Sequence, residues 1–380
     1  MSDFNAANER PWGRRLWLQL HRWIGLLLLI LLIPVSVSGS LLVWDHWTDG
    51  WINPQRYAVS GEAAARPLSD YVVRARTVLD PADRVASVAF PAGGGGPVVV
   101  TASAPAANGG PPPPRTQVWL HPANARLLDH ADMDSGLIRV LHRFHGSMMM
   151  AEWGRPIVGW LGVAMLISVL TGLWLWLPVT GGLKRGFRWN RAPSLSGRLH
   201  HQFGFWIALP LAILSFTGAY ISFPNAMRSV EGMFASSGPA RGGPPAPGGG
   251  RAAPAAESRL DPDEALAAAS AKLNGAQPIS FRWPTERAAE WSLTVEKGGI
   301  RRDIIVDDET GETRANPPQT TAARFMRTLH DGTGYNPVWQ VIIFVGGLVP
   351  ALLGITGLMM WLRGRRVKRR VAGGPPVPAT

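Results

Sequence analysis

Histidine is the residue type in this sequence whose spacing best suits chemistry. The chain contains nine histidines and no cysteine. His21 and His200 lie in the similar segments LHRWIGL and LHHQFGF, and each is followed 18 residues later by a glycine, Gly39 and Gly218 (39 − 21 and 218 − 200). Matched offsets of this kind favour an internal repeat. We call His21 and His200 the first pair.

A second pair, His145 and His330, shows the same kind of match. Each precedes a Thr-Gly dipeptide, with the glycine 27 residues later (172 − 145 and 357 − 330). Two repeat-related histidines that face each other would supply both axial ligands of one haem, so two pairs predict two haems. Because cysteine is absent, the CxxCH attachment of c-type haem is excluded and the predicted cofactor is haem b.

Gly39 and Gly218 are predicted to belong to the same sites. Eighteen residues are five helical turns, so each glycine shares a helix face with its histidine and lies ~27 Å further along. This places both glycines near the level of the second pair. There a residue without a side chain would leave room for a flat macrocycle.

Two neighbouring histidines are alternative ligands, His201 beside His200 and His142 one turn before His145. A metal site without haem is a second interpretation, because His142, His145 and the run 148–150 (MMM) would suit copper. That interpretation leaves the first pair unexplained. The histidines at 46, 121 and 130 lie outside the repeat and are interpreted as surface residues.

Four apolar segments are long enough to hold these histidines in a bilayer, which takes roughly 20 apolar residues. A signal peptide is disfavoured for the first segment, because its apolar stretch is long and no clear cleavage site follows. The expected fold class is therefore a membrane α-helical protein. Its predicted transmembrane helices are 16–44, 142–177, 199–224 and 329–362.

Charge predicts the orientation of these helices. Hydrophobic residues make up 46% of the chain, charged residues only 17%, and the net charge is +12. A nucleic-acid-binding domain would carry more charge, so lipid is the expected partner and nucleic acid is excluded. The basic surplus lies in 1–15, 178–198 and 363–380, which are predicted to be cytoplasmic. Segments 45–141 and 225–328 have nearly balanced charge and are predicted to lie on the other side.

The two long segments each predict a small α+β module. Each has a helical stretch (67–79 and 262–273) followed by strand-like stretches, and each ends in a strand–turn–strand pattern. Gly/Pro-rich inserts at 93–96, 111–114 and 238–250 are interpreted as flexible connectors. Because the order helix–module–helix occurs twice, the halves are predicted to be parallel repeats about an axis along the membrane normal.

The segments LHRWIGL, FHGSMMMAEWGR, RLHHQFGFW and LHDGTG, together with the α+β modules, resemble the PepSY-associated transmembrane proteins. Within that family the likeness is closest to FoxB-type ferric-siderophore (ferrioxamine) reductases of the bacterial inner membrane. The resemblance covers nearly the whole chain except the inserts and tails. It implies PepSY-like periplasmic modules and two b haems that carry electrons outward to a ferric siderophore, from which iron leaves as Fe(II).

The resemblance also implies an oxidoreductase with an external electron donor. Some relatives carry a fused flavodoxin or flavin reductase domain, and this sequence shows none, so membrane quinol or a cytosolic reductase is expected to supply electrons. The sequence does not identify a residue that contacts substrate. Ion transport is disfavoured, because the predicted helices contain almost no acidic residue beyond Asp45 and Glu152.

Two other function classes stay open. The chain would be colourless if it is a non-catalytic envelope protein whose modules bind a peptidase or another partner. It would bind haem without turning over ferric siderophore if it is the electron-transfer subunit of another reductase, such as one for sulfoxides.

Overall fold

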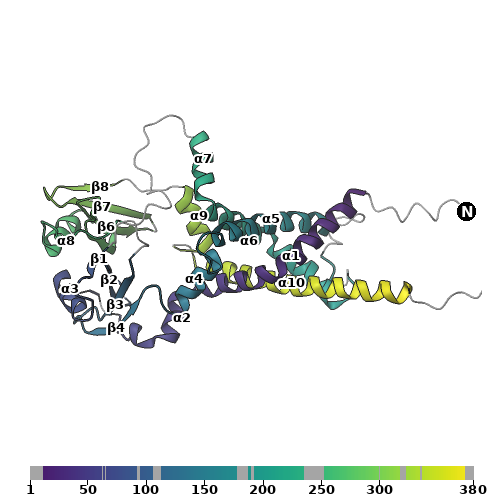
Figure 1. The fold of residues 1–380 in the computed structure, drawn as a ribbon, viewed down its shortest axis with the longest axis horizontal. Helices are drawn as coiled ribbons and strands as arrows, with labels where there is room; N and C mark the ends of the chain where they lie inside the picture. Colours follow the sequence, from purple (N-terminus) through teal and green to yellow (C-terminus); the bar gives the residue numbers. More distant parts are fainter. Residues whose placement is uncertain are drawn as a thin grey trace, which may run out of the picture. The chain divides into compact units, whose positions relative to one another are not determined.

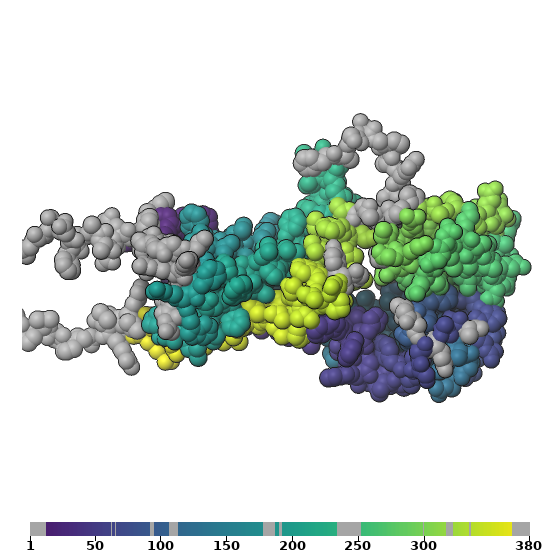
Figure 2. Space-filling model, turned by 180° about the vertical axis from the view of Figure 1, so that it is seen from behind, coloured from purple at the N-terminus to yellow at the C-terminus, as the bar shows by residue number. Residues whose placement is uncertain are grey.

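The structure is a computed structural model that describes residues 12–372 except 62, 65, 92–94, 106–112, 178–186, 190–191, 235–251, 299, 317–321 and 334–335. The chain forms two compact units. The helical unit comprises Met1–Val43, Leu141–Met233 and Phe325–Thr380, and the sheet unit comprises Trp44–Val140 and Phe234–Arg324. Each unit therefore combines segments far apart in sequence, as the colours of Figures 1 and 2 show. The predicted connectors, the basic loop 178–198 and both tails lie at least partly outside the described residues.

Four helices of the described chain are long and apolar enough to cross a membrane. They are α1 (Trp12–Leu42), α5 (Gly154–Trp176), α6 (Leu195–Ser222) and α10 (Pro337–Ala372). Helix α1 packs against α5 and α10, and α6 packs against the same two helices (Figure 1). Helices α1 and α6 therefore lie diagonally opposite each other in a four-helix arrangement. The predicted number of membrane helices is confirmed.

The second and fourth predicted helices are each divided in two. Helix α4 (Leu137–Ser147) ends before Met148 and Met149, whose φ angles of 50° and 63° are left-handed, and α5 begins only at Gly154. A Cβ on Gly154 would lie 1.7 Å from the Ser147 carbonyl oxygen, so only glycine fits this close approach. Helix α9 (Ala322–Asp331) is likewise separate from α10, which begins at a proline, a residue favoured at that position. The second pair thus lies on short helices rather than inside long ones.

The sheet unit contains one eight-stranded antiparallel sheet with strand order β4-β3-β2-β1-β5-β6-β7-β8. The modules predicted as separate are joined, because β1 pairs with β5 in the register Val88↔Phe281. Each would otherwise be an edge strand with unpaired backbone groups. The first half contains α3 (Leu68–Arg76), β1 (Arg84–Ala89), β2 (Val98–Ser103), β3 (Arg115–Leu120) and β4 (Leu127–Asp132). The second contains α8 (Pro262–Ser270), β5 (Gln277–Arg282), β6 (Glu290–Lys297), β7 (Ile300–Asp307) and β8 (Thr313–Ala315).

Helices α3 and α8 pack into the core of this unit. Tyr71 of α3 and Ala265 of α8 are fully buried with Phe281 and Trp291 of the sheet. The starts of the two helices are also linked, because the Asp263 carboxylate in the first turn of α8 accepts hydrogen bonds from backbone N–H groups at the start of α3. A carboxylate satisfies N–H groups that a helix start leaves without partners. The two halves therefore share a core and a capping contact as well as a sheet.

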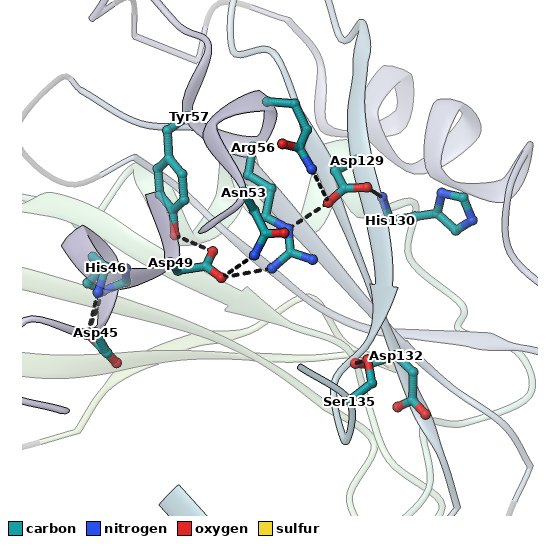
Figure 3. A network of polar contacts seen from close by, with 11 residues as sticks. Asp45, His46, Asp49, Asn53, Arg56, Tyr57, Asp129, His130, Asp132 and Ser135 are labelled. Carbon is teal, nitrogen blue, oxygen red and sulfur yellow. Dashed lines mark hydrogen bonds and ion pairs between the residues drawn. The ribbon is translucent and has the colours of Figure 1, made fainter. Parts of the chain in front are cut away.

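Beside edge strand β4 lie α2 (Asp45–Ile52) and the 3₁₀ turn η1 (Pro54–Tyr57). Arg56 holds them there, donating to Asp129 of β4 (Nε to Oδ2, 2.6 Å) and to Asp49 of α2 (Nη1 to Oδ1, 2.9 Å; Figure 3). Its guanidinium lies 4.0 Å from the Trp119 ring centroid. Burial, and a hydrogen bond to Asp49, raise the pKa of the Tyr57 hydroxyl. The remaining helix, α7 (Pro224–Phe234), follows α6.

Candidate functional site

The first pair meets inside the helical unit. His21 projects from α1 and His200 from α6, the two diagonally opposed helices. Their ring centroids are 6.2 Å apart, and the ring planes are 79° from parallel. The two histidines that the matched sequence offsets selected therefore lie together, although they are almost half the chain apart in sequence.

The second pair meets in the same way. His145 projects from α4 and His330 from α9, with ring centroids 6.1 Å apart and an interplanar angle of 37°. Both separations between facing imidazoles are thus nearly equal, although one pair stands on long helices and the other on short ones.

Each histidine of the first pair is held through Nδ1 by a neighbouring long helix. His21 contacts the Ser168 carbonyl oxygen at 3.0 Å and Thr171 Oγ1 at 3.1 Å, both on α5. His200 contacts the Leu353 carbonyl oxygen at 3.1 Å and Thr356 Oγ1 at 3.1 Å, both on α10. A carbonyl oxygen only accepts, so Nδ1 carries the proton in both rings. Nε2 is then left with its lone pair.

The second pair is held by the same arrangement on α1 and α6. His145 Nδ1 donates to the Val35 carbonyl oxygen at 2.8 Å, and His330 Nδ1 contacts Thr217 Oγ1 at 2.9 Å. The hydroxyl of Thr217 donates to a carbonyl of its own helix, so it accepts from the imidazole N–H. Nε2 is again the nitrogen with a lone pair. A histidine that binds a metal is usually oriented in this manner by a hydrogen bond from its other nitrogen.

A glycine lies against the imidazole in all four cases. A Cβ would lie 2.6 Å from His145 at Gly39, 2.9 Å from His21 at Gly172, 3.1 Å from His330 at Gly218 and 3.4 Å from His200 at Gly357. Gly39 and Gly218 are therefore at the predicted level. The space beside them is filled by the imidazole of the second pair, and not left open for a macrocycle, because α4 and α9 bring these rings onto α1 and α6.

Each of the four imidazoles lies against its own copy of the same three-residue motif, which we call a clamp. A clamp consists of a glycine, the residue directly before it and the residue four positions before it. The residue before the glycine is Ser38, Thr171, Thr217 or Thr356. All four hydroxyls donate to a carbonyl of their own helix, and the three threonines also contact the imidazole Nδ1. Within the described residues, no such contact joins Ser38 to His145. The sequence contained the Thr-Gly signal at positions 171 and 356, but a role for those residues appears only when the helices are packed.

The alternative ligands occupy other positions. The imidazole facing His21 belongs to His200, and the ring of His201 lies 6.5 Å from that of His200 at 82°. His142 lies one turn before His145 on α4. The ring that faces His145 is that of His330, and the copper interpretation gives no role to His330. His46 and His130 are exposed.

The pair geometry suits two ligands on opposite sides of one metal atom. With metal–nitrogen bonds of about 2 Å, two such imidazoles have ring centroids roughly 6–6.5 Å apart. Two ligands do not hold a bare ion, and the described residues contain no group of three or more His, Cys, Asp or Glu side chains placed to do so. The donor set therefore fits a cofactor that brings its own equatorial ligands, as haem does.

Comparison with known proteins places the chain in a family. The sequence has no significant match among curated proteins. A family model described as the PepSY-associated TM region matches residues 18–364. That match includes α5, α6, most of α1 and α10, both histidine pairs and the sheet unit. The chain is thus a multi-pass membrane protein that belongs to the PepSY-associated transmembrane family.

Proposed function

We propose that this protein is a di-haem b oxidoreductase of the bacterial inner membrane that passes electrons across the bilayer and reduces a ferric siderophore in the periplasm, releasing Fe(II). The observation that carries the proposal is the presence of two facing histidine pairs, each with a protonated Nδ1 and a separation suited to one metal atom. Haem iron bound between two imidazoles supplies reversible one-electron chemistry.

The chain's own residues explain why two separate cofactors are proposed. Each pair would hold one haem iron through two imidazoles, and an iron held in this way would not bind dioxygen. The clamps hold the rings in one tautomer, so Nε2 of every ligand is available without rearrangement. Preorganised ligands of this kind are typical of electron carriers, whose coordination does not change with oxidation state.

The segments between the two pairs are apolar, which favours electron transfer over ion transport. A buried cluster joins all four long helices at positions between the first-pair histidines and the glycines of the second pair: Leu28, Met165, Ile207, Leu211 and Val349. Such a cluster offers no polar groups to a crossing ion, whereas an electron requires none.

The direction of transfer rests on charge and on the family resemblance. The basic segments 1–15, 178–198 and 363–380 favour a cytoplasmic location for both termini. The sheet unit is then periplasmic and the first pair lies nearer the cytoplasm. Electrons would come from membrane quinol or a cytosolic reductase. Siderophores bind iron through hard oxygen ligands, which hold Fe(II) less tightly than Fe(III), so reduction releases the metal.

The first experiment is a spectrum of the detergent-purified protein, oxidised and dithionite-reduced, with a pyridine haemochrome count. Two low-spin b haems per chain are expected. The second step mixes the reduced protein with ferrioxamine under anaerobic conditions and follows haem reoxidation together with Fe(II) captured by a chelator. One Fe(II) per electron delivered supports the reductase.

The remaining outcomes separate the other function classes. A protein that holds two haems yet is not reoxidised by ferric siderophores would be the electron-transfer subunit of a different reductase. A protein that stays colourless after expression with added haem would overturn the redox proposal and favour a partner-binding envelope protein.

A further inference from the structure

Two arginines lie beside the second pair. Arg327 is on α9, one turn before His330, and interacts electrostatically with it. Arg155 is in the first turn of α5, and its Nη2 donates to the Ile221 carbonyl oxygen at 2.7 Å. Ile221 follows Gly218, the glycine against His330, by one turn of α6. The Arg155 guanidinium is therefore placed about one turn beyond the clamp of His330.

The two guanidinium groups also lie near enough to act on each other through their charges. Arg155 and Arg327 interact electrostatically, and the interaction is repulsive because both are cations. Within the described part of the chain, neither forms an ion pair with a carboxylate. Asp331, one turn after Arg327 on α9, accepts from the Thr333 backbone N–H instead. Two adjacent cations without an acid are destabilising unless an anion lies between or beside them.

Their exposure is consistent with such an anion. Both arginines are exposed, whereas the imidazoles that they adjoin are half-buried. A ligand held between His145 and His330 would thus have one part among apolar helices, and the edge of the ligand nearest to the solvent would lie at the two arginines. Guanidinium groups bind carboxylates through paired hydrogen bonds better than any other side chain.

We propose that Arg155 and Arg327 form a carboxylate-binding edge of the second site and bind the two propionate groups of its haem. This inference rests on the proposed function, because it takes the second pair as haem ligands. Two cations and two carboxylates balance in charge, which removes the repulsion between the arginines. The site would then accept a carboxylated porphyrin and discriminate against its esters.

The pair of cations has a second consequence for the same site. Positive charge nearby favours the form of the cofactor that carries one more electron, so it raises the reduction potential. Replacement of either arginine by an uncharged residue should therefore lower the potential of the second haem. The first pair should be unaffected, because it lies ~27 Å further along α1.

The test compares the wild type with Arg155→Gln, Arg327→Gln and the double variant. Haem per chain, the rate of haem transfer to excess apomyoglobin and the two reduction potentials are measured for each. We expect the double variant to lose its second haem at least tenfold faster and any retained second haem to have a lower potential. Arg155→Lys and Arg327→Lys should restore part of both effects. Arg324→Gln, two turns from His330 on the same helix, is the matched control.

A second experiment changes the cofactor instead of the protein, by replacing haem with haem dimethyl ester. The wild type, stripped of haem and reconstituted, should bind the ester more weakly than haem at the second site, and the double variant should bind both equally. The first haem reports whether a variant is folded, since a merely structural loss would release both haems together. A double variant with unchanged haem transfer and unchanged potentials would overturn the inference. A wild type without haem would instead overturn the proposed function itself.

Discussion

The two histidine pairs have nearly equal separations but differ in how they are held. The first pair stands on α1 and α6 and has both a carbonyl and a threonine hydroxyl at each Nδ1. The second pair stands on the short helices α4 and α9, where Thr217 contacts His330 Nδ1 but, within the described residues, no contact joins the Ser38 hydroxyl to His145. The same ring separation is thus reached from long helices and from short ones, while the contacts at Nδ1 and the angle between the rings differ from one pair to the other.

Removal of a ligand is the strongest test of the comparison. His21→Ala or His200→Ala should each reduce the haem content from two to one and remove the first haem. His145→Ala or His330→Ala should remove the second in the same way. The pyridine haemochrome count measures this, and reduction potentials identify the haem that remains.

The neighbouring histidines are the matched controls for that test. His201→Ala and His142→Ala should keep both haems, because the rings that face His21 and His330 are those of His200 and His145. Loss of a haem in His201→Ala, with retention in His200→Ala, would show that the first pair has been assigned to the wrong residue.

The clamp glycines predict a graded effect. Alanine at Gly39, Gly172, Gly218 and Gly357 places a Cβ 2.6, 2.9, 3.1 and 3.4 Å from the imidazole. A ring fixed by a metal bond cannot move aside, so the overpacking should cost about 1–3 kcal/mol at the tightest position, a roughly 5- to 150-fold faster haem loss. Haem transfer to apomyoglobin measures the rate.

The order of the series is the sensitive part of this prediction. Gly39→Ala should be the most damaging variant and Gly357→Ala close to neutral. Gly25→Ala on α1 is the control, since nothing lies within 4 Å of its Cβ. Equal losses at all four positions would show that the imidazoles do not occupy these glycine pockets when the haems are bound.

The hydroxyl groups predict a smaller effect that separates the pairs. Thr171→Val or Thr356→Val removes one of two Nδ1 acceptors, which makes the imidazole a weaker donor to Fe(III). The potential of the first haem should rise by ~20–40 mV, the equivalent of ~0.5–1 kcal/mol. Ser38→Ala should leave the second haem's potential unchanged, and a comparable shift there would remove this difference between the pairs. Spectroelectrochemical titration provides the measurement.

The smallest expected difference needs no substitution. The imidazole planes are 79° apart in the first pair and 37° apart in the second. Nearly perpendicular axial rings leave two iron d orbitals closer in energy than rings nearer to parallel. The oxidised protein should therefore show two distinct low-spin signals in electron paramagnetic resonance, with the larger maximum g value from the first haem. Loss of that signal in His200→Ala would assign it.

Much of the helical unit could be predicted from sequence because its determinants are local. Apolar length defined the four membrane helices, and repeat offsets selected four of nine histidines. The break between α4 and α5 could not be foreseen, because methionine is a good helix former and Met148 adopts its left-handed conformation only in the folded turn. Strand β2, next to a Gly/Pro-rich insert, was not predicted, and neither were α2 and α7.

The clamps and the joined sheet were beyond prediction for a different reason. Hydrogen bonds from His21 to Thr171 and pairing of Val88 with Phe281 depend on which segments lie side by side. No periodicity within one segment carries that information. The sequence could show that each half contains a module, but not that the modules share a sheet.

The pairing of β1 with β5 has a consequence for biogenesis. Strand β1 ends at Ala89, and its partner begins only at Gln277, after the chain has produced α5 and α6. At synthesis rates of roughly 5–20 residues per second, the edge of β1 stays without its partner for on the order of ten seconds or more. During that interval two membrane helices must be inserted while an unpaired edge strand is exposed to other chains. Formation of the complete sheet must therefore follow synthesis of the second half, and until then the first half has a free strand edge that β5 later covers.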